Sequence, residues 1–271
     1  MNLRETSIAR ASLTGRRNRE DASAGFSLPT GGVPVAAPRW HWVTPGTGEL
    51  SAGSLMEPLA PETLDFPNDP VPPAFFHLFA ALERQTRPAG VLGITSAIPG
   101  EGKTTLALYL ARTIACSTDQ RVCLLDLSLG QDEICRRIGV SPAPAGAMGF
   151  LEAGQPLAVL ECGGLFPLSV APAGRAPNNP ARTARSPRVA ELLSSLRAAY
   201  DLVIVDLPSV AGDNAVPLAH QMDSLVLVVR AGATPRGLIQ GAVETLGHDR
   251  ISGVVLNRVT SPRRRPKGFL A

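Results

Sequence analysis

The sequence has few aromatic residues, few cysteines and no long hydrophobic run. Aromatic side chains make up 4% of its 271 residues, and its four cysteines are scattered without a C-x-x-C pair. This scarcity argues against a disulfide framework and against a cysteine-rich zinc site. Apolar runs such as residues 225–229 are far shorter than the roughly 20 residues that a membrane-spanning helix needs. No signal-peptide pattern opens the sequence, so we expect a protein of the reducing cytoplasm.

Charged residues are also few, and neither sign dominates. Charged residues account for 18% of the chain, and the formal net charge is only +3. This balance predicts no nucleic-acid partner. Residues 260–271 are locally basic, and we expect them to form a short tail. Such charges are usually solvated, but contact with anionic lipid at the inner face of the cell membrane is an open alternative.

Glycine and proline are abundant, with 26 and 25 copies. Residues 1–72 contain few periodic apolar positions, so we expect a disordered, Pro/Gly-rich tail there. Both tryptophans, Trp40 and Trp42, lie in this stretch. They could anchor a partner, or they could fold back onto the domain that follows.

Residues 73–259 alternate between helical patterns and short runs of β-branched and aliphatic residues. The strands that we expect are residues 91–96, 121–126, 165–170, 201–206, 224–229 and 251–257. Nearly continuous apolar strands separated by helices indicate a doubly wound, mostly parallel sheet with helices on both faces. We therefore predict an α/β domain of the P-loop NTPase class, with its site at the carboxyl ends of the strands.

The segment SAIPGEGKTT follows the first of these strands and opens a helix near Lys103. This context is typical of a phosphate-binding loop, in which glycines turn backbone N–H groups toward phosphate oxygens. Lys103 would reach the β- and γ-phosphates of ATP, and the Thr104 hydroxyl would hold Mg²⁺. The nucleotide-binding residues that we predict in this loop are Pro99, Gly100, Glu101, Gly102, Lys103, Thr104 and Thr105.

Three polar residues end other strands of the predicted sheet. Asp206 follows four apolar residues and is placed to support Mg²⁺ together with Thr104. Asp126 ends the strand after the loop helix, where it could act as a base or orient water. Asn257 ends the last strand and could bond the adenine edge, although a turn-forming asparagine is the alternative. Lys103, Asp126 and Asp206 are the predicted catalytic residues.

Motifs spread over about residues 75–259 resemble the cytoplasmic domain of the bacterial tyrosine kinases, or BY-kinases. These motifs are SAIPGEGKTT, the strand ending at Asp126, GAMGFLEAG, SVAPAGRAPNNP, SPRVAELLSSLRAAYDLVIVDLP and SGVVLNRV. The resemblance implies the MinD/ParA branch of P-loop ATPases, and a role in capsule or exopolysaccharide synthesis. Partition-type relatives usually carry a lysine where Ile98 stands, which favours the kinase branch.

The sequence departs from this family at three places. The family's Asp-x-Asp-x-Arg motif has Ser128 and Gly130 in place of its second acid and its arginine. The Glu-x-x-Arg-x-x-Arg pattern that supports ring assembly is replaced by Pro73, Phe76 and Phe79, so that helix packs on its own domain or meets a different partner. The chain's two tyrosines lie at positions 109 and 200, so the family's C-terminal tyrosine cluster is missing.

The resemblance implies a Mg-ATP-binding, BY-kinase-like protein with weak ATPase activity and a reduced kinase apparatus. An active kinase acting on tyrosines of other proteins and a MinD/ParA-type positioning ATPase are the alternatives. The implied partner is a membrane-embedded chain-length or export protein of polysaccharide synthesis. Self-association stays open, and no nucleic-acid partner is expected.

Overall fold

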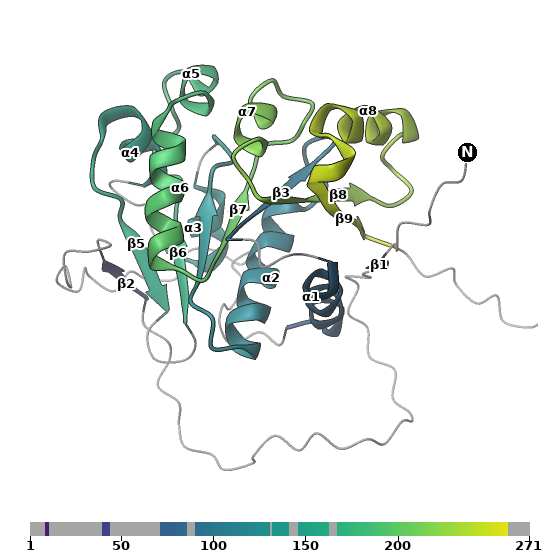
Figure 1. The fold of residues 1–271 in the computed structure, drawn as a ribbon, viewed down its shortest axis with the longest axis horizontal. Helices are drawn as coiled ribbons and strands as arrows, with labels where there is room; N and C mark the ends of the chain where they lie inside the picture. The colour runs from purple at the N-terminus through teal and green to yellow at the C-terminus, as the bar shows by residue number, and fades with distance from the viewer. Residues whose placement is uncertain are drawn as a thin grey trace, which may run out of the picture.

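One twisted β-sheet runs through the middle of the molecule (Figure 1). The computed structural model describes residues 9–10, 40–43, 71–85, 90–130, 132–140, 146–162 and 167–259. In these residues the sheet has nine strands in the order β1-β9-β8-β3-β7-β4-β6-β5-β2. The parallel neighbours are joined through helices, as crossover connections require, whereas β5 and β6 follow each other directly and are antiparallel.

The central strands are parallel and apolar, and they are buried except for β9, whose residues are mostly only partly buried. They are β3 (Val91–Ser96), β4 (Val122–Asp126), β6 (Leu168–Ala171), β7 (Leu202–Asp206), β8 (Ser224–Arg230) and β9 (Ile251–Asn257). β5 (Val159–Cys162) pairs antiparallel with β6. The predicted α/β class with a mostly parallel, doubly wound sheet is therefore confirmed.

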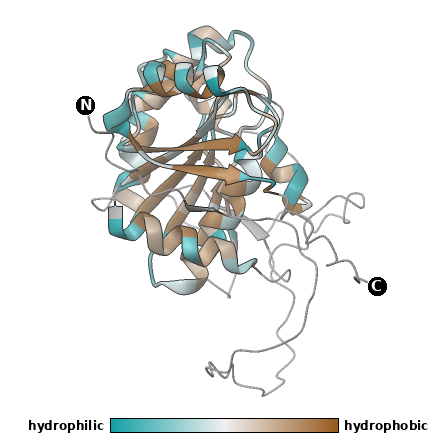
Figure 2. Ribbon diagram, turned by 90° about the vertical axis from the view of Figure 1, so that its right-hand side faces the viewer, coloured by the Kyte–Doolittle hydropathy of each residue, from teal (hydrophilic) through white to brown (hydrophobic). Residues whose placement is uncertain are grey.

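Two layers of helices enclose the sheet, and Figure 2 shows the apolar strands between them. One layer holds α1 (Pro73–Gln85), α2 (Lys103–Ser117) and α3 (Glu133–Ile138). The other holds α4 (Ala147–Ala153), α5 (Pro180–Ala184), α6 (Arg188–Ala199), α7 (Ala215–Ala219) and α8 (Arg236–Leu246), followed by the short turn η1 (His248–Arg250). Within the described residues, none of these helices is long and apolar enough to cross a bilayer.

Two short strands come from the segment that the sequence predicts as a tail. β1 (Ala9–Arg10) pairs parallel with β9, and β2 (Trp40–Val43) pairs antiparallel with β5. These six residues pair with the sheet, because open backbone groups at both sheet edges accept a further strand. The expectation of a disordered tail stays a prediction for the other residues before α1. The backbone of Trp40 and Trp42 pairs with β5, so this segment folds back onto the domain. The other residues of 1–70, and residues 260–271, lie outside the described part of the chain.

Helix α1 packs on its own domain. Phe75, Leu78 and Leu82 recur at helical spacing and are buried against α2 and the sheet. The ring of Phe75 stacks on Tyr109 of α2, with 4.9 Å between the ring centroids. Phe79 is partly buried in the same cluster, while Phe76 on the other side of the helix is 44% exposed. Of the two alternatives for this helix, its packing on the domain is therefore realised.

Candidate nucleotide-binding site

The turn between β3 and α2 has the backbone geometry of a phosphate-binding loop. Gly100 and Gly102 have φ angles of +81° and +100°, which only glycine adopts readily. The Ser96 hydroxyl donates to the Ile98 carbonyl at 2.7 Å and thereby stabilises the turn. Helix α2 starts at Lys103, as predicted, so its first N–H groups lie beside the loop. This arrangement can bind a phosphate group.

Asn257, at the end of β9, positions the loop through a side-chain hydrogen bond. Its side chain is 3% exposed, and its Nδ2 donates to the Glu101 carbonyl at 2.7 Å. A Cβ atom at Gly102 would lie only 2.2 Å from this Nδ2, so glycine is required there by space as well as by φ. The Oδ1 atom accepts from the Arg258 backbone N–H at 2.8 Å. The structure thus gives Asn257 a positioning contact with the loop, and its contact with adenine stays a prediction.

Glu101 is turned into the protein and is only 1% exposed. One carboxylate oxygen accepts from the Ile98 N–H at 2.9 Å. The other accepts from the Arg230 N–H at 2.9 Å and from the Thr234 hydroxyl. Hydrogen bonds from three donors stabilise this buried charge and connect the loop to the end of β8. Pro99 and Gly100, by contrast, are exposed on the outer side of the loop.

Two aspartates meet beside the first turn of α2. Asp126 and Asp206 end the adjacent strands β4 and β7 and are directly opposite each other in the register. The Thr104 hydroxyl donates to Asp206 Oδ2 at 2.5 Å. Asp126 Oδ1 accepts from the Ser128 backbone N–H at 2.9 Å. The structure therefore brings together the loop and both strand-end acids that the sequence singled out.

Burial of these two acids raises the pKa of both. Both carboxyl groups are fully buried, and desolvation is the largest cause of each shift. The pKa of Asp126 rises to about 7, with the neighbouring Asp206 charge as the second cause. The pKa of Asp206 rises to about 6, because the Thr104 hydrogen bond and the nearby Lys103 charge partly oppose the desolvation. In the metal-free protein these carboxyl groups therefore hold a proton at a higher pH than exposed aspartates do.

The same acids fit a magnesium ion. Asp126 Oδ2 and Asp206 Oδ1 are buried and have no hydrogen-bond partner among the described residues. Mg²⁺ prefers oxygen ligands and usually retains waters and substrate phosphates beside one or two carboxylates. The Thr104 hydroxyl adds a third oxygen at this place. Thr104 and Asp206 were the predicted metal residues, and the geometry adds Asp126 as a candidate.

Sequence reasoning missed a charged pair on α3. Arg137 Nη1 donates to the Thr105 hydroxyl at 2.9 Å, and its Nη2 lies 2.8 Å from Glu133 Oε1. The Arg137 charge also partly opposes the rise in the pKa of Asp206 that burial causes. The i,i+4 spacing of Glu133 and Arg137 was the available signal. That spacing does not reveal that α3 lies beside the first turn of α2.

Comparison with known proteins shows which family this fold and site belong to. No family model matches the sequence. The tyrosine-protein kinase YwqD of Bacillus subtilis is 30% identical over 182 residues, covering 66% of this chain and 75% of that protein. The succinoglycan biosynthesis transport protein ExoP of Rhizobium meliloti is 32% identical over 177 residues, covering 62% of this chain and 22% of that protein. The kinase-domain structure of VpsO has a TM-score of 0.61 at 30% identity, covering 69% of this chain and 96% of that one.

The sheet order and the loop between β3 and α2 define the fold of a P-loop NTPase. Within that class, the chain belongs to the family of bacterial tyrosine kinases. It spans 26% of the length of two longer curated relatives from Ralstonia.

Proposed function

We propose that this chain binds Mg-ATP between the β3–α2 loop and the paired aspartates and hydrolyses it slowly, as a BY-kinase-like protein of exopolysaccharide or capsule synthesis. The observation that carries the proposal is the Thr104–Asp206 hydrogen bond beside Asp126, directly at the loop. It supports a site in which phosphate, metal and a potential base are within reach of one another.

Each group has a distinct task in this proposal. The loop N–H groups and Lys103 bind the β- and γ-phosphates. Thr104, Asp206 and Asp126 would hold Mg²⁺, and a bound Mg²⁺ would neutralise charge on the phosphate oxygens. Asp126 also orients the attacking water or accepts its proton. Glu101 and Asn257 position the loop, since their polar side-chain atoms bond to protein groups.

A reduced kinase apparatus is favoured by residues that the family pattern does not have. Ser128 stands where the pattern has its second acid, and its N–H serves to bond Asp126. Gly130 provides no charged group at the arginine position. Of the two tyrosines, Tyr109 stacks on Phe75 in the core. Tyr200 is partly buried, and burial raises the pKa of its phenol to about 12. Both tyrosines are partly buried, and neither belongs to a C-terminal cluster.

The pathway and the partner rest on the relatives. ExoP is named as a succinoglycan biosynthesis transport protein, and it is much longer than the segment that this chain matches. We infer that this chain works with a membrane-embedded chain-length or export protein of a similar system. In this view ATP orders the segments beside the γ-phosphate, and the ordered form docks on that protein.

The test is a phosphate-release assay on the full chain with Mg-ATP. Turnover that disappears in Lys103→Ala and falls strongly in Asp126→Asn, but persists in the surface variant Arg236→Ala, supports the proposal. Wild-type turnover that is unaffected by Lys103→Ala would contradict it.

Tyrosine phosphorylation of other proteins is the second candidate, because YwqD is named as a tyrosine-protein kinase. Incubation with γ-labelled ATP and a tyrosine-rich acceptor polypeptide separates the two functions. Label transfer that vanishes in Asp126→Asn would favour an active kinase. Phosphate release without label transfer would favour the ATPase.

A further inference from the structure

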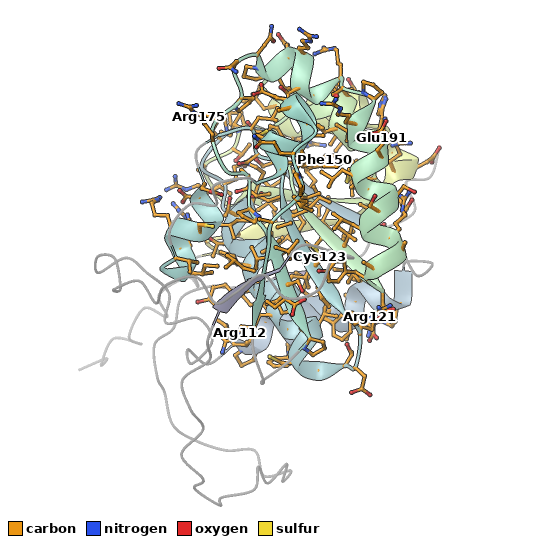
Figure 3. All side chains as sticks on the ribbon, turned by 90° about the vertical axis from the view of Figure 1, so that its left-hand side faces the viewer. Arg112, Arg121, Cys123, Phe150, Arg175 and Glu191 are labelled. Carbon is orange, nitrogen blue, oxygen red and sulfur yellow. The ribbon has the colours of Figure 1, made fainter. Side chains whose placement is uncertain are left out.

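A second concave site lies in the helix layer opposite to α2. A cavity of about 780 Å³ opens between the end of α4, the segment before α5, and the start of α6. Figure 3 shows Arg175, just before this segment, at the opposite end of the sheet from Arg121, which precedes β4. The cavity is lined by none of the loop residues or aspartates of the nucleotide site. The cavity is therefore separate from the nucleotide site.

The charge of this cavity is positive. Arg182, Arg185 and Arg188 line it, and Glu152 is the carboxylate among the lining residues. In the part of the chain that the structure describes, no salt bridge involves any of the three guanidinium groups. Three cations facing one carboxylate leave a net charge that favours an anion.

Glu152 is already engaged by neutral donors. Its Oε1 accepts from the Asn178 backbone N–H at 2.9 Å and from the Thr183 hydroxyl at 3.3 Å. Its Oε2 accepts from Asn178 Nδ2 at 3.4 Å. These bonds hold the carboxylate to the segment before α5 and to α5 itself. In the described residues, Glu152 therefore forms no ion pair with these arginines.

Two of the guanidinium groups are held by backbone contacts. Arg188 Nη1 donates to the Leu151 carbonyl at 3.5 Å, and the guanidinium lies against Gly154 at the end of α4. Arg185 Nη1 donates to the Ala181 carbonyl at 3.0 Å. A guanidinium carries five N–H donors, so each group keeps further donors for a ligand. Such partly fixed forks match the geometry of phosphate oxygens.

We infer that this cavity binds a small phosphate monoester with a hydroxyl-rich body, the chemistry of a sugar phosphate. Its volume lies in the range of about 300–1,000 Å³ that is usual for small-molecule sites. Its lining is mainly amide, hydroxyl and guanidinium groups, with Leu151 and Pro187 as apolar members. The guanidinium donors of this lining suit a polar, doubly charged ligand better than an apolar one. The inference is independent of nucleotide binding at the loop.

Calorimetric titration of the full chain tests it, with inorganic phosphate and with glucose 1-phosphate as probes. The titrations are made in a Lys103→Ala background, so that phosphate binding at the loop does not contribute. We expect binding that weakens at least about tenfold in Arg182→Ala/Arg185→Ala, because two charge-assisted contacts are lost. Arg236→Ala on α8 is the matched control and keeps the affinity. Arg182 and Arg185 are exposed, so we expect the double variant to fold normally. An unchanged thermal melting temperature verifies this.

Three results would overturn the inference. The first is no binding of either probe tighter than about 1 mM. The second is equal affinity in the double arginine variant and its background. The third is association with phosphatidic acid vesicles without binding of the soluble probes, which would assign the arginines to a lipid surface. Glu152→Gln removes the negative charge from the cavity, and a gain in probe affinity in this variant would support the inference.

Discussion

At the scale of single residues, two neighbouring buried carboxylates determine how the site affects stability and metal binding. Asp126 and Asp206 are fully buried, and each has a carboxylate oxygen with no hydrogen-bond partner among the described residues. Such a pair is costly when both members are charged and no cation is near. A magnesium ion removes this cost. The same feature that destabilises the metal-free protein therefore favours binding of the metal.

The pH dependence of the metal-free protein follows from these shifts. A carboxyl group whose pKa is raised in the folded state binds its proton more tightly there than in the unfolded chain. Stability is then lost as the pH rises from the unfolded value of about 4 toward the folded values of about 6 and 7. We predict that Asp126→Asn stabilises the metal-free protein at pH 8 by an amount on the order of a few kcal/mol.

Urea unfolding at pH 5 and pH 8 in the presence of a chelator measures this effect. The difference between Asp126→Asn and wild type shrinks at pH 5, where Asp126 is protonated. Asp119→Asn, at an exposed position, serves as the control and shows no such difference. A variant that is less stable than wild type at pH 8 would show that Asp126 is not a buried, strained charge.

Glu101 supports a second residue-scale prediction. Its two oxygens accept from three donors, and a glutamine has only one oxygen to offer them. Glu101→Gln should therefore destabilise the protein by about 1–3 kcal/mol, because a buried N–H donor loses its acceptor. Thermal or urea unfolding measures the loss, and Glu244→Gln on the exposed side of α8 is the matched control. Equal stability of the two variants would contradict the role of Glu101 as the connection between the loop and β8.

The sequence predicted which residues gather at the site better than it predicted their contacts. The spacing of SAIPGEGKTT and the strand-end positions of Asp126 and Asp206 were sufficient to place them at one sheet edge, because parallel strands end together. The inward turn of Glu101 depends on the end of β8, which lies 129 residues away along the chain. The place of Arg137 depends on how α3 packs. Local patterns contain neither contact.

At the scale of elements, α1 shows how an apolar replacement of a charged pattern is accommodated. One side of the helix is buried against α2, with Phe75 only 1% exposed. Its neighbour Phe76 is 44% exposed on the other side. This contrast gives a matched pair of phenylalanines for measuring what the packing of α1 contributes.

Phe75→Ala should destabilise the protein by about 3–5 kcal/mol, the usual cost of removing a buried aromatic side chain. Phe76→Ala should change stability by no more than about 0.5 kcal/mol, since its ring is largely exposed. Urea unfolding of the two variants beside wild type makes the comparison. Similar losses in both would mean that α1 does not pack on the domain as described.

Several parallel strands and the longer helices were predicted from the sequence, and the short helices were not. The strands β3, β7 and β9 and the helices α1 and α2 have clear apolar periodicity and lie where expected. Helices α3, α4, α5 and α7 have seven residues or fewer, too few for a periodic signal. α4 is held by tertiary contacts instead. A Cβ atom at Gly146 would lie 2.5 Å from the Pro172 carbonyl oxygen, so only glycine allows this approach to the end of β6.

For the whole molecule, the sheet gathers two sets of charged groups with opposite sign. The paired aspartates and the loop lie at the ends of β4, β7 and β3, and they suit a cation together with phosphates. The arginine-lined cavity lies beyond the end of β6, in the other helix layer. The doubly wound topology explains this arrangement, because loops from both layers converge on the carboxyl ends of the strands.

Calorimetric titration of the full chain with Mg-ATP tests the central claim most directly. We predict saturable binding to the wild type and to the Arg236→Ala control, and a loss of at least about tenfold in affinity in Lys103→Ala, because a charge-assisted phosphate contact is removed. Wild-type protein that shows no binding of Mg-ATP, or Lys103→Ala that binds it as tightly as wild type, would contradict the account.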